Sequence, residues 1–87
     1  MIICSAIKFH LVSNPIYPVI MTGLRHSDIL KQMFNLRLVY NKIGAVQGFL
    51  TDEYQFLDRY KAKEHAISCG QIKTSEYEEL YSEDIWP

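Results

Sequence analysis

Arg25 and His26 lie in the stretch "GLRHSDI" (23–29), just before the expected start of a helix. A helix N-terminus attracts anions, because its first backbone N–H groups have no partner within the helix and its dipole is positive at that end. A guanidinium pairs with phosphate oxygens through two parallel hydrogen bonds. The stretch therefore predicts an anion-binding site, and an ordinary surface arginine beside a helix start is the alternative.

A second stretch, "GFLTDEYQFLDRYK" (48–61), repeats this arrangement and adds aromatic residues. Arg59 follows Asp58 at the start of another expected helix, and Phe49 precedes them on an expected strand. An arginine that holds phosphate beside a ring that stacks on a base is a combination that binds phosphorylated nucleosides. This corner is either the wall of a binding site for such a ligand or an ordinary strand-to-helix corner. In the alternative, Asp58 only caps the helix, Phe49 fills the core and Arg59 is solvated.

Residues that could support catalysis are scattered along the chain. The three histidines have no HExxH or HxH spacing, and no serine lies in a GxSxG turn. The glycines form neither a phosphate-binding loop nor a dinucleotide fingerprint. Cys4 and Cys69 do not form a CxxC pair and have no zinc-ligand spacing. We therefore expect a protein that is not an enzyme and that has no metal site and no cofactor.

The charge pattern separates a mildly basic body from an acidic tail. The net charge is −1, but residues 1–70 carry eight Lys or Arg and five Asp or Glu, whereas residues 71–87 carry one Lys and five acids. A chain with this balance is not expected to bind a nucleic-acid backbone. The tail is either solvated or packed on a basic face of its own chain or of a neighbour.

No segment approaches 18 consecutive apolar residues, and the N-terminal stretch does not resemble a secretory signal. We therefore expect no membrane partner, reduced cysteines and a cytoplasmic location.

The expected elements are those of a small α+β protein, with two helices packed on an antiparallel sheet. Ser27 is a candidate N-cap for the first helix and Asp58 for the second, and Gly70 is expected to end the second. Residues 1–87 are expected to form a single domain, with residues 72–87 as its acidic, partly apolar tail. The expected strands are 2–12, 19–22, 45–51 and 56–57, the turns are 13–18 and 52–55, and the helices are 28–38 and 59–69.

Four motifs, "RHSDI", "GFLTDEYQFLDRYKA", "SCGQI" and "LYSEDIW", occur in this order between about residues 20 and 87. In this combination the chain resembles a group of short phage proteins that is similar to the first type of anti-Thoeris proteins. The turn after "GFLT" lacks the glycine usual in that group and reads "DEYQ". The resemblance implies a non-enzymatic protein that sequesters a cyclic ADP-ribose isomer or a cyclic oligonucleotide in the cytoplasm of an infected bacterium. A small protein-interaction inhibitor or accessory phage protein without such a ligand is the alternative.

The resemblance also implies ligand-facing residues. As ligand-facing residues, Arg25 and Arg59 would pair with a diphosphate and Phe49 would stack on adenine. Asp58 or Asp84 would accept hydrogen bonds from ribose or adenine. The full set is Arg25, His26, Phe49, Thr51, Asp58, Arg59 and Asp84.

A homo-oligomer, at least a dimer, is also expected. The core of so short a chain is small, and six Tyr and four Phe are many for it. Tyr81, Ile85 and Trp86 are the residues expected to dock the tail on a neighbouring subunit.

Overall fold

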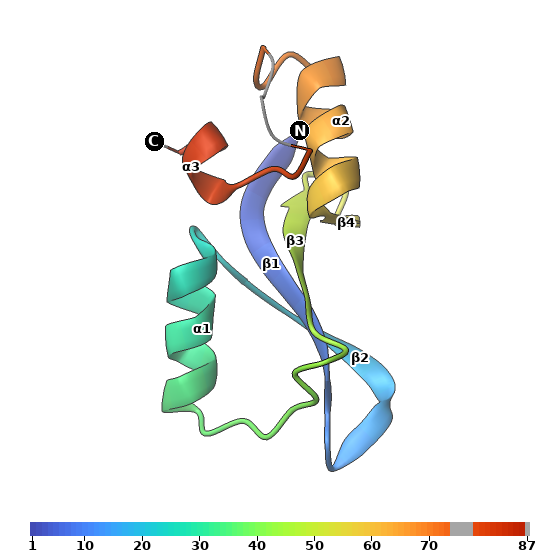
Figure 1. The fold of residues 1–87 in the computed structure, drawn as a ribbon, viewed down its shortest axis with the longest axis vertical. Helices are drawn as coiled ribbons and strands as arrows, with labels where there is room; N and C mark the ends of the chain where they lie inside the picture. The colour runs from blue at the N-terminus through green and yellow to red at the C-terminus, as the bar shows by residue number, and fades with distance from the viewer. Residues whose placement is uncertain (74–77, 87) are drawn as a thin grey trace.

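A computed structural model describes residues 1–73 and 78–86. Its sheet has four antiparallel strands in the order β2-β1-β3-β4, and the helices pack on it, so the α+β prediction is confirmed (Figure 1). The elements are β1 (Ile2–Leu11), β2 (Asn14–Gly23), α1 (His26–Asn35), β3 (Val46–Thr51), β4 (Phe56–Asp58), α2 (Arg59–Ser68) and α3 (Ser82–Ile85).

The hairpin of β1 and β2 is longer than the sequence predicts. The turn expected over 13–18 is wrong, because β2 already begins at Asn14 and the connection is only Val12–Ser13. Pro15 and Pro18 favour a turn in a sequence reading. Because β2 is an edge strand, however, prolines without an N–H are tolerated there.

Helix α1 begins and ends earlier than the predicted 28–38. Arg25, not Ser27, is the N-cap residue, and its backbone N–H donates to the Asp28 carboxylate at 3.2 Å. At the other end, the N–H of Arg37 donates to Phe34 and the N–H of Leu38 donates to Met33. These two bonds form a Schellman motif, which turns the chain out of the helix.

Helix α2 and its surroundings follow the prediction closely. The Asp58 carboxylate caps the helix by accepting from the Lys61 N–H at 2.8 Å. Gly70 has a φ of 76° and follows the helix end, as expected for a glycine C′ residue. The short return strand after the turn at 52–55 is β4, which pairs with β3.

Two apolar clusters fill the space between the sheet and the helices. In the first, Ile7 and Phe9 of β1 pack against Ile29 and Met33 of α1. The second joins the other half of the sheet to α2 and to the C-terminal segment. Its buried members are Ile2, Phe49, Leu57, Ala62, Ala66 and Leu80.

The C-terminal segment 78–86 packs on its own chain, and its expected docking on a neighbouring subunit stays a prediction. Leu80 is fully buried, and its N–H donates to the Arg59 carbonyl at 3.0 Å. Ile85 and Trp86 pack against the second apolar cluster. The remainder of the predicted tail, residues 74–77 and 87, lies outside the described residues.

Candidate functional site

His26 is buried in a chain of polar contacts that ties three parts of the fold together. Its Nε2 lies 2.7 Å from the Gly48 carbonyl oxygen, and its Nδ1 lies 3.0 Å from Ser82 Oγ. Ser82 Oγ in turn lies 2.8 Å from Ser5 Oγ, which donates to the Leu24 carbonyl at 2.9 Å. A carbonyl can only accept, so Nε2 carries the proton toward Gly48. In neutral His26, Nδ1 then accepts from Ser82.

The serine–histidine pair has the spacing of a nucleophile and its base, but both side chains are buried. Burial lowers the pKa of His26, and the nearby Arg59 cation acts in the same direction. Ser82 is also buried, and its hydroxyl is held by Ser5 and His26. The pair therefore connects α3 to the sheet and to α1, and it presents no reactive group to a substrate.

Arg25 and Arg59 hold the C-terminal segment. Arg25 donates to the Trp86 carbonyl and lies 3.7 Å from the Glu83 carboxylate. Arg59 donates to Gln47 Oε1 at 2.7 Å and lies 3.8 Å from the Glu79 carboxylate. The Arg59 guanidinium also lies over a ring, 4.8 Å from the centroid of Tyr81. Both arginines predicted to bind a phosphate thus already have acidic partners from their own chain.

The other predicted site residues take structural positions. Phe49 has no exposed surface, because its ring packs edge-on against His26 and also contacts Trp86. Thr51 is buried, and its hydroxyl accepts from two backbone N–H groups of the β3–β4 turn. Asp58 caps α2, and the Asp84 carboxylate accepts from the Tyr81 N–H at 2.8 Å in the first turn of α3. The Phe49 ring is thus closed to a ligand in this conformation.

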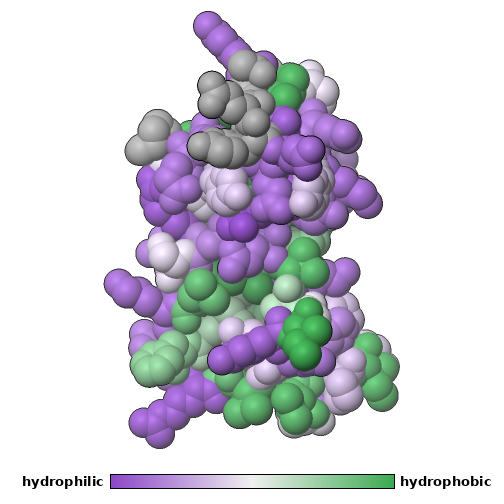
Figure 2. All heavy atoms as spheres, viewed as in Figure 1, coloured by the Kyte–Doolittle hydropathy of each residue, from purple (hydrophilic) through white to green (hydrophobic). Residues whose placement is uncertain are grey.

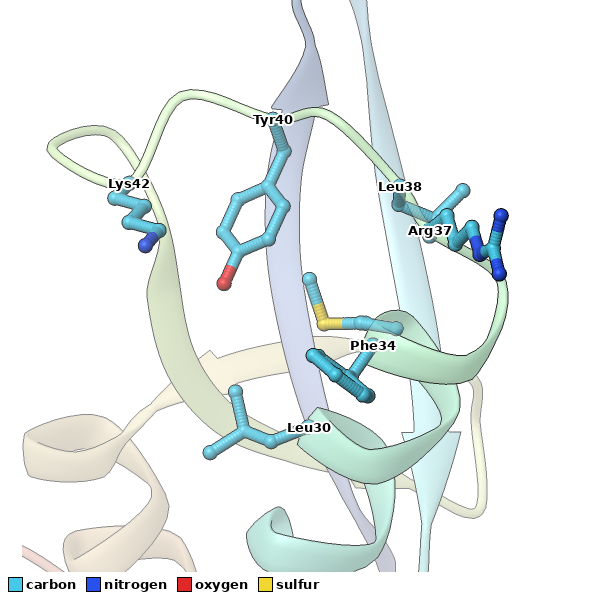
Figure 3. A pocket seen from close by; sticks show the side chains of 7 residues that line it. Leu30, Phe34, Arg37, Leu38, Tyr40 and Lys42 are labelled. Carbon is cyan, nitrogen blue, oxygen red and sulfur yellow. The ribbon is translucent and has the colours of Figure 1, made fainter.

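A hollow of about 590 Å³ lies elsewhere, where α1 ends and the chain turns back toward β3. Figure 3 shows Phe34 and Leu30 projecting from α1 on one side and Tyr40 projecting toward them from the loop 36–45. Lys42 and Arg37 stand on opposite sides of the hollow. The lining residues are Leu30, Met33, Phe34, Arg37, Leu38, Tyr40 and Lys42.

The polar groups that line this hollow are those of Arg37, Lys42 and Tyr40. Within residues 1–73 and 78–86, no hydrogen bond or ion pair engages the Arg37 guanidinium, the Lys42 ammonium or the Tyr40 hydroxyl. The Tyr40 ring is held in place by Phe9, with 5.2 Å between ring centroids. Phe34 is 82% exposed, so one face of its ring is open to a ligand. Two free cations, a phenol and an open aromatic ring therefore surround an apolar floor that contains no carboxylate.

The backbone is strained at one residue that lines this hollow. Arg37 has a φ of 53°, the left-handed region that glycine adopts most readily. It occupies the C′ position of the Schellman motif, which is usually glycine. Such strain costs about 1–3 kcal/mol and is found preferentially at ligand-binding positions. The strained backbone fixes where the Arg37 side chain leaves the end of α1.

Sequence reasoning missed this hollow because it assigned residues through 38 to the helix. An uninterrupted helix would have separated the Arg37 side chain from Tyr40 and Lys42, which follow in the loop. The available signal was the mixture of aromatic and cationic residues in "FNLRLVYNK" (34–42), a stretch without any acid.

In the described part of the chain, no three His, Cys, Asp or Glu side chains come together in a way that could hold a metal ion. No helix among residues 1–73 and 78–86 is both long and apolar enough to cross a membrane.

The chain was compared with protein families, with curated proteins and with solved structures. The model of a protein family described as "Phage T4 y16D protein" matches residues 1–86. Searches of curated proteins and of solved structures found no match.

Proposed function

This chain belongs to the phage T4 y16D protein family, and we propose that it is a non-enzymatic anti-defence protein that sequesters a nucleotide-type immune signal. The signal class is that implied by the sequence resemblance, a cyclic ADP-ribose isomer or a cyclic oligonucleotide. The ligand would occupy the hollow between α1 and the loop 36–45.

The observation that carries this proposal is the set of unpartnered polar groups around an apolar hollow. Arg37 and Lys42 can pair with phosphate oxygens without first giving up an acidic partner. The exposed Phe34 ring offers a stacking surface for a base, and stacking on an aromatic side chain contributes about 1–3 kcal/mol per base. The Tyr40 hydroxyl can donate to or accept from the ligand's polar edge.

The two anion sites predicted at Arg25 and Arg59 are less suitable for binding a phosphate in the conformation described. An anion at Arg25 would compete with Glu83, and an anion at Arg59 would compete with Glu79. Each replacement exchanges one anion for another, so little net attraction is gained. The ligand-binding roles of the seven residues predicted from the sequence remain predictions.

Sequestration without turnover fits the chemistry of the hollow. Its lining has no Ser, Thr, Cys, His, Asp or Glu side chain, so no carboxylate or imidazole of the lining can take a proton from Lys42 or Tyr40 to activate them. A bound nucleotide should therefore be released unchanged. The expected homo-oligomer also stays a prediction, for which light scattering is the test.

Isothermal titration calorimetry with cyclic ADP-ribose and with a cyclic dinucleotide tests the proposal. We expect at least one of them to bind, and Lys42→Gln to weaken that binding by roughly 1.5–3 kcal/mol, the range for hydrogen bonds to charged groups. Lys31→Gln is the matched control, because Lys31 is an exposed cation of α1 that does not line the hollow. Absence of binding heat with both ligands, confirmed by an unchanged melting temperature, would overturn the proposal.

A further inference from the structure

Six large apolar side chains are exposed at one end of the molecule, which we call the apolar end. Ile43 is 98% exposed and Ile16 is 77% exposed. They come from two neighbouring segments, the β1–β2 hairpin and the loop 36–45. The full set is Val12, Ile16, Tyr17, Leu36, Val39 and Ile43.

Backbone hydrogen bonds join these two segments. The N–H of Val12 donates to the Val39 carbonyl at 3.0 Å, and the N–H of Asn41 donates to the His10 carbonyl at 3.1 Å. Val12, Pro15 and Ile43 also line one shallow hollow together. Figure 2 shows apolar residues gathered over the lower half of the molecule, where Figure 1 places the hairpin and the end of α1. The apolar side chains therefore project from two loops that are fixed side by side.

Most acidic side chains lie far from the apolar end, whereas two basic side chains lie close to it. Asp28 is the only Asp or Glu in the first 51 residues, and it lies at the opposite end of α1 from the loop 36–45. Arg37 and Lys42 belong to that loop. Asp58, at the end of β4, lines a hollow together with Gly44 of that loop. The remaining acids of the described chain belong to the turn after β3, to α2 and to the C-terminal segment, which Figure 1 places at the far end of a molecule 41 Å long. The apolar end is thus cationic, and the far end carries most of the carboxylates.

We propose that the apolar end docks on the surface of an anionic lipid bilayer. Apolar side chains that project from loops can enter the interface between headgroups and acyl chains, while neighbouring cations pair with anionic headgroups. The separation of charge along the molecule would orient this end toward a negative surface. A face-to-face pair of copies is disfavoured, because it would bring Arg37 and Lys42 together with their counterparts and supply no acid.

The apolar side chains of this end, among them Ile43 and Ile16, do not line the hollow that is proposed to bind a nucleotide, whereas Arg37 and Lys42 belong to both surfaces. The docking proposal also departs from the sequence-based expectation of no membrane partner. That expectation was based on the lack of a segment long and apolar enough to span a bilayer. Docking at the interface needs no segment that crosses the bilayer.

Flotation with vesicles tests the proposal. The unchanged protein should float with vesicles containing phosphatidylglycerol, and should stay unbound with vesicles of phosphatidylcholine alone. Ile43→Ser should weaken binding on the order of tenfold, because a nearly fully exposed isoleucine loses its insertion but supports no core contact. Lys42→Gln should weaken it about fivefold, and added salt should act in the same direction.

The matched controls lie at the other end of the molecule. Ile67→Ser changes an exposed isoleucine of α2, and Lys61→Gln changes an exposed lysine of the same helix. Neither should alter flotation by more than about twofold. Calorimetry with the nucleotide probes should be unaffected by Ile43→Ser, so the two proposals can fail separately.

Three outcomes would overturn membrane docking. One is failure of the unchanged protein to float with phosphatidylglycerol vesicles. The second is equal binding to both kinds of vesicle, or an equal effect of the Ile43 and Ile67 substitutions. The third is a protein that does not bind vesicles but self-associates in light scattering, with Ile43→Ser abolishing the self-association. That result would mean that the apolar end binds a second copy of the chain.

Discussion

Ser82 Oγ lies 3.0 Å from Nδ1 of His26, and this contact fastens the C-terminal segment to the start of α1. The two residues are 56 positions apart in the sequence. Both are buried, so the state of one imidazole affects how a distant segment is held.

The His26 contact predicts a pH dependence of stability. Burial lowers the pKa of His26 below its ordinary value of 6.5, so the unfolded chain binds a proton more readily than the folded one. Stability that is present above pH 6.5 is therefore lost as the pH falls through the unfolded value toward the lower folded value. Urea unfolding at a series of pH values between neutral and acidic should show this loss.

His26→Asn is the comparison for that experiment. It keeps a polar side chain at the position but removes the titrating group, so the fall in stability below pH 6.5 should become shallower. The assignment to His26 is wrong if His26→Asn keeps the original slope.

Gly48 predicts a strong effect of one added methyl group. A Cβ at this position would overlap the Leu57 carbonyl oxygen and come within 2.7 Å of the Phe56 ring. Gly48→Ala should therefore destabilise the protein by about 1–3 kcal/mol or more, because the backbones of β3 and β4 would have to separate. Gly44→Ala is the control, since nothing lies within 4 Å of a Cβ there. Similar urea midpoints for the two variants would contradict this description of the strand pair.

Arg37 predicts opposite effects on folding and on ligand binding. Arg37→Gly relieves a left-handed backbone conformation and should raise the free energy of unfolding by up to about 1 kcal/mol. The same change removes a guanidinium from the hollow and should weaken binding of the nucleotide probe. Urea unfolding measures the change in the free energy of unfolding, and calorimetry measures the change in affinity for the nucleotide probe. A variant that is more stable and binds as tightly as the unchanged protein would remove Arg37 from the site.

The elements that the sequence predicts well are those marked by local chemistry. Asp58 caps α2 and Gly70 follows its end, because a carboxylate at an N-cap and a glycine after a helix act through neighbouring backbone groups. The extent of β2 was not predictable in this way. Pro15 and Pro18 favour a turn unless the strand is known to lie at the edge of the sheet, which is a property of the whole fold.

The site residues show the same division between local and distant information. The aromatic, acid and arginine pattern around Asp58 was visible in the sequence, but nothing in it showed that Glu79 would pair with Arg59. The hollow was missed because the left-handed conformation of Arg37 breaks a helical pattern that apolar spacing continues through Leu38. The Arg59–Glu79 pair and the conformation of Arg37 both depend on contacts that form only in the folded protein.

The central claim is that the nucleotide-type ligand binds in the hollow at the end of α1, and not at the arginine corners held by the C-terminal segment. Calorimetric titration of cyclic ADP-ribose or the cyclic dinucleotide, whichever binds, into Lys42→Gln and Arg59→Gln tests it most directly. We predict that Lys42→Gln weakens binding by roughly tenfold or more and that Arg59→Gln leaves the affinity unchanged. Loss of binding in Arg59→Gln, with full binding in Lys42→Gln, would contradict the claim and place the ligand beneath the C-terminal segment.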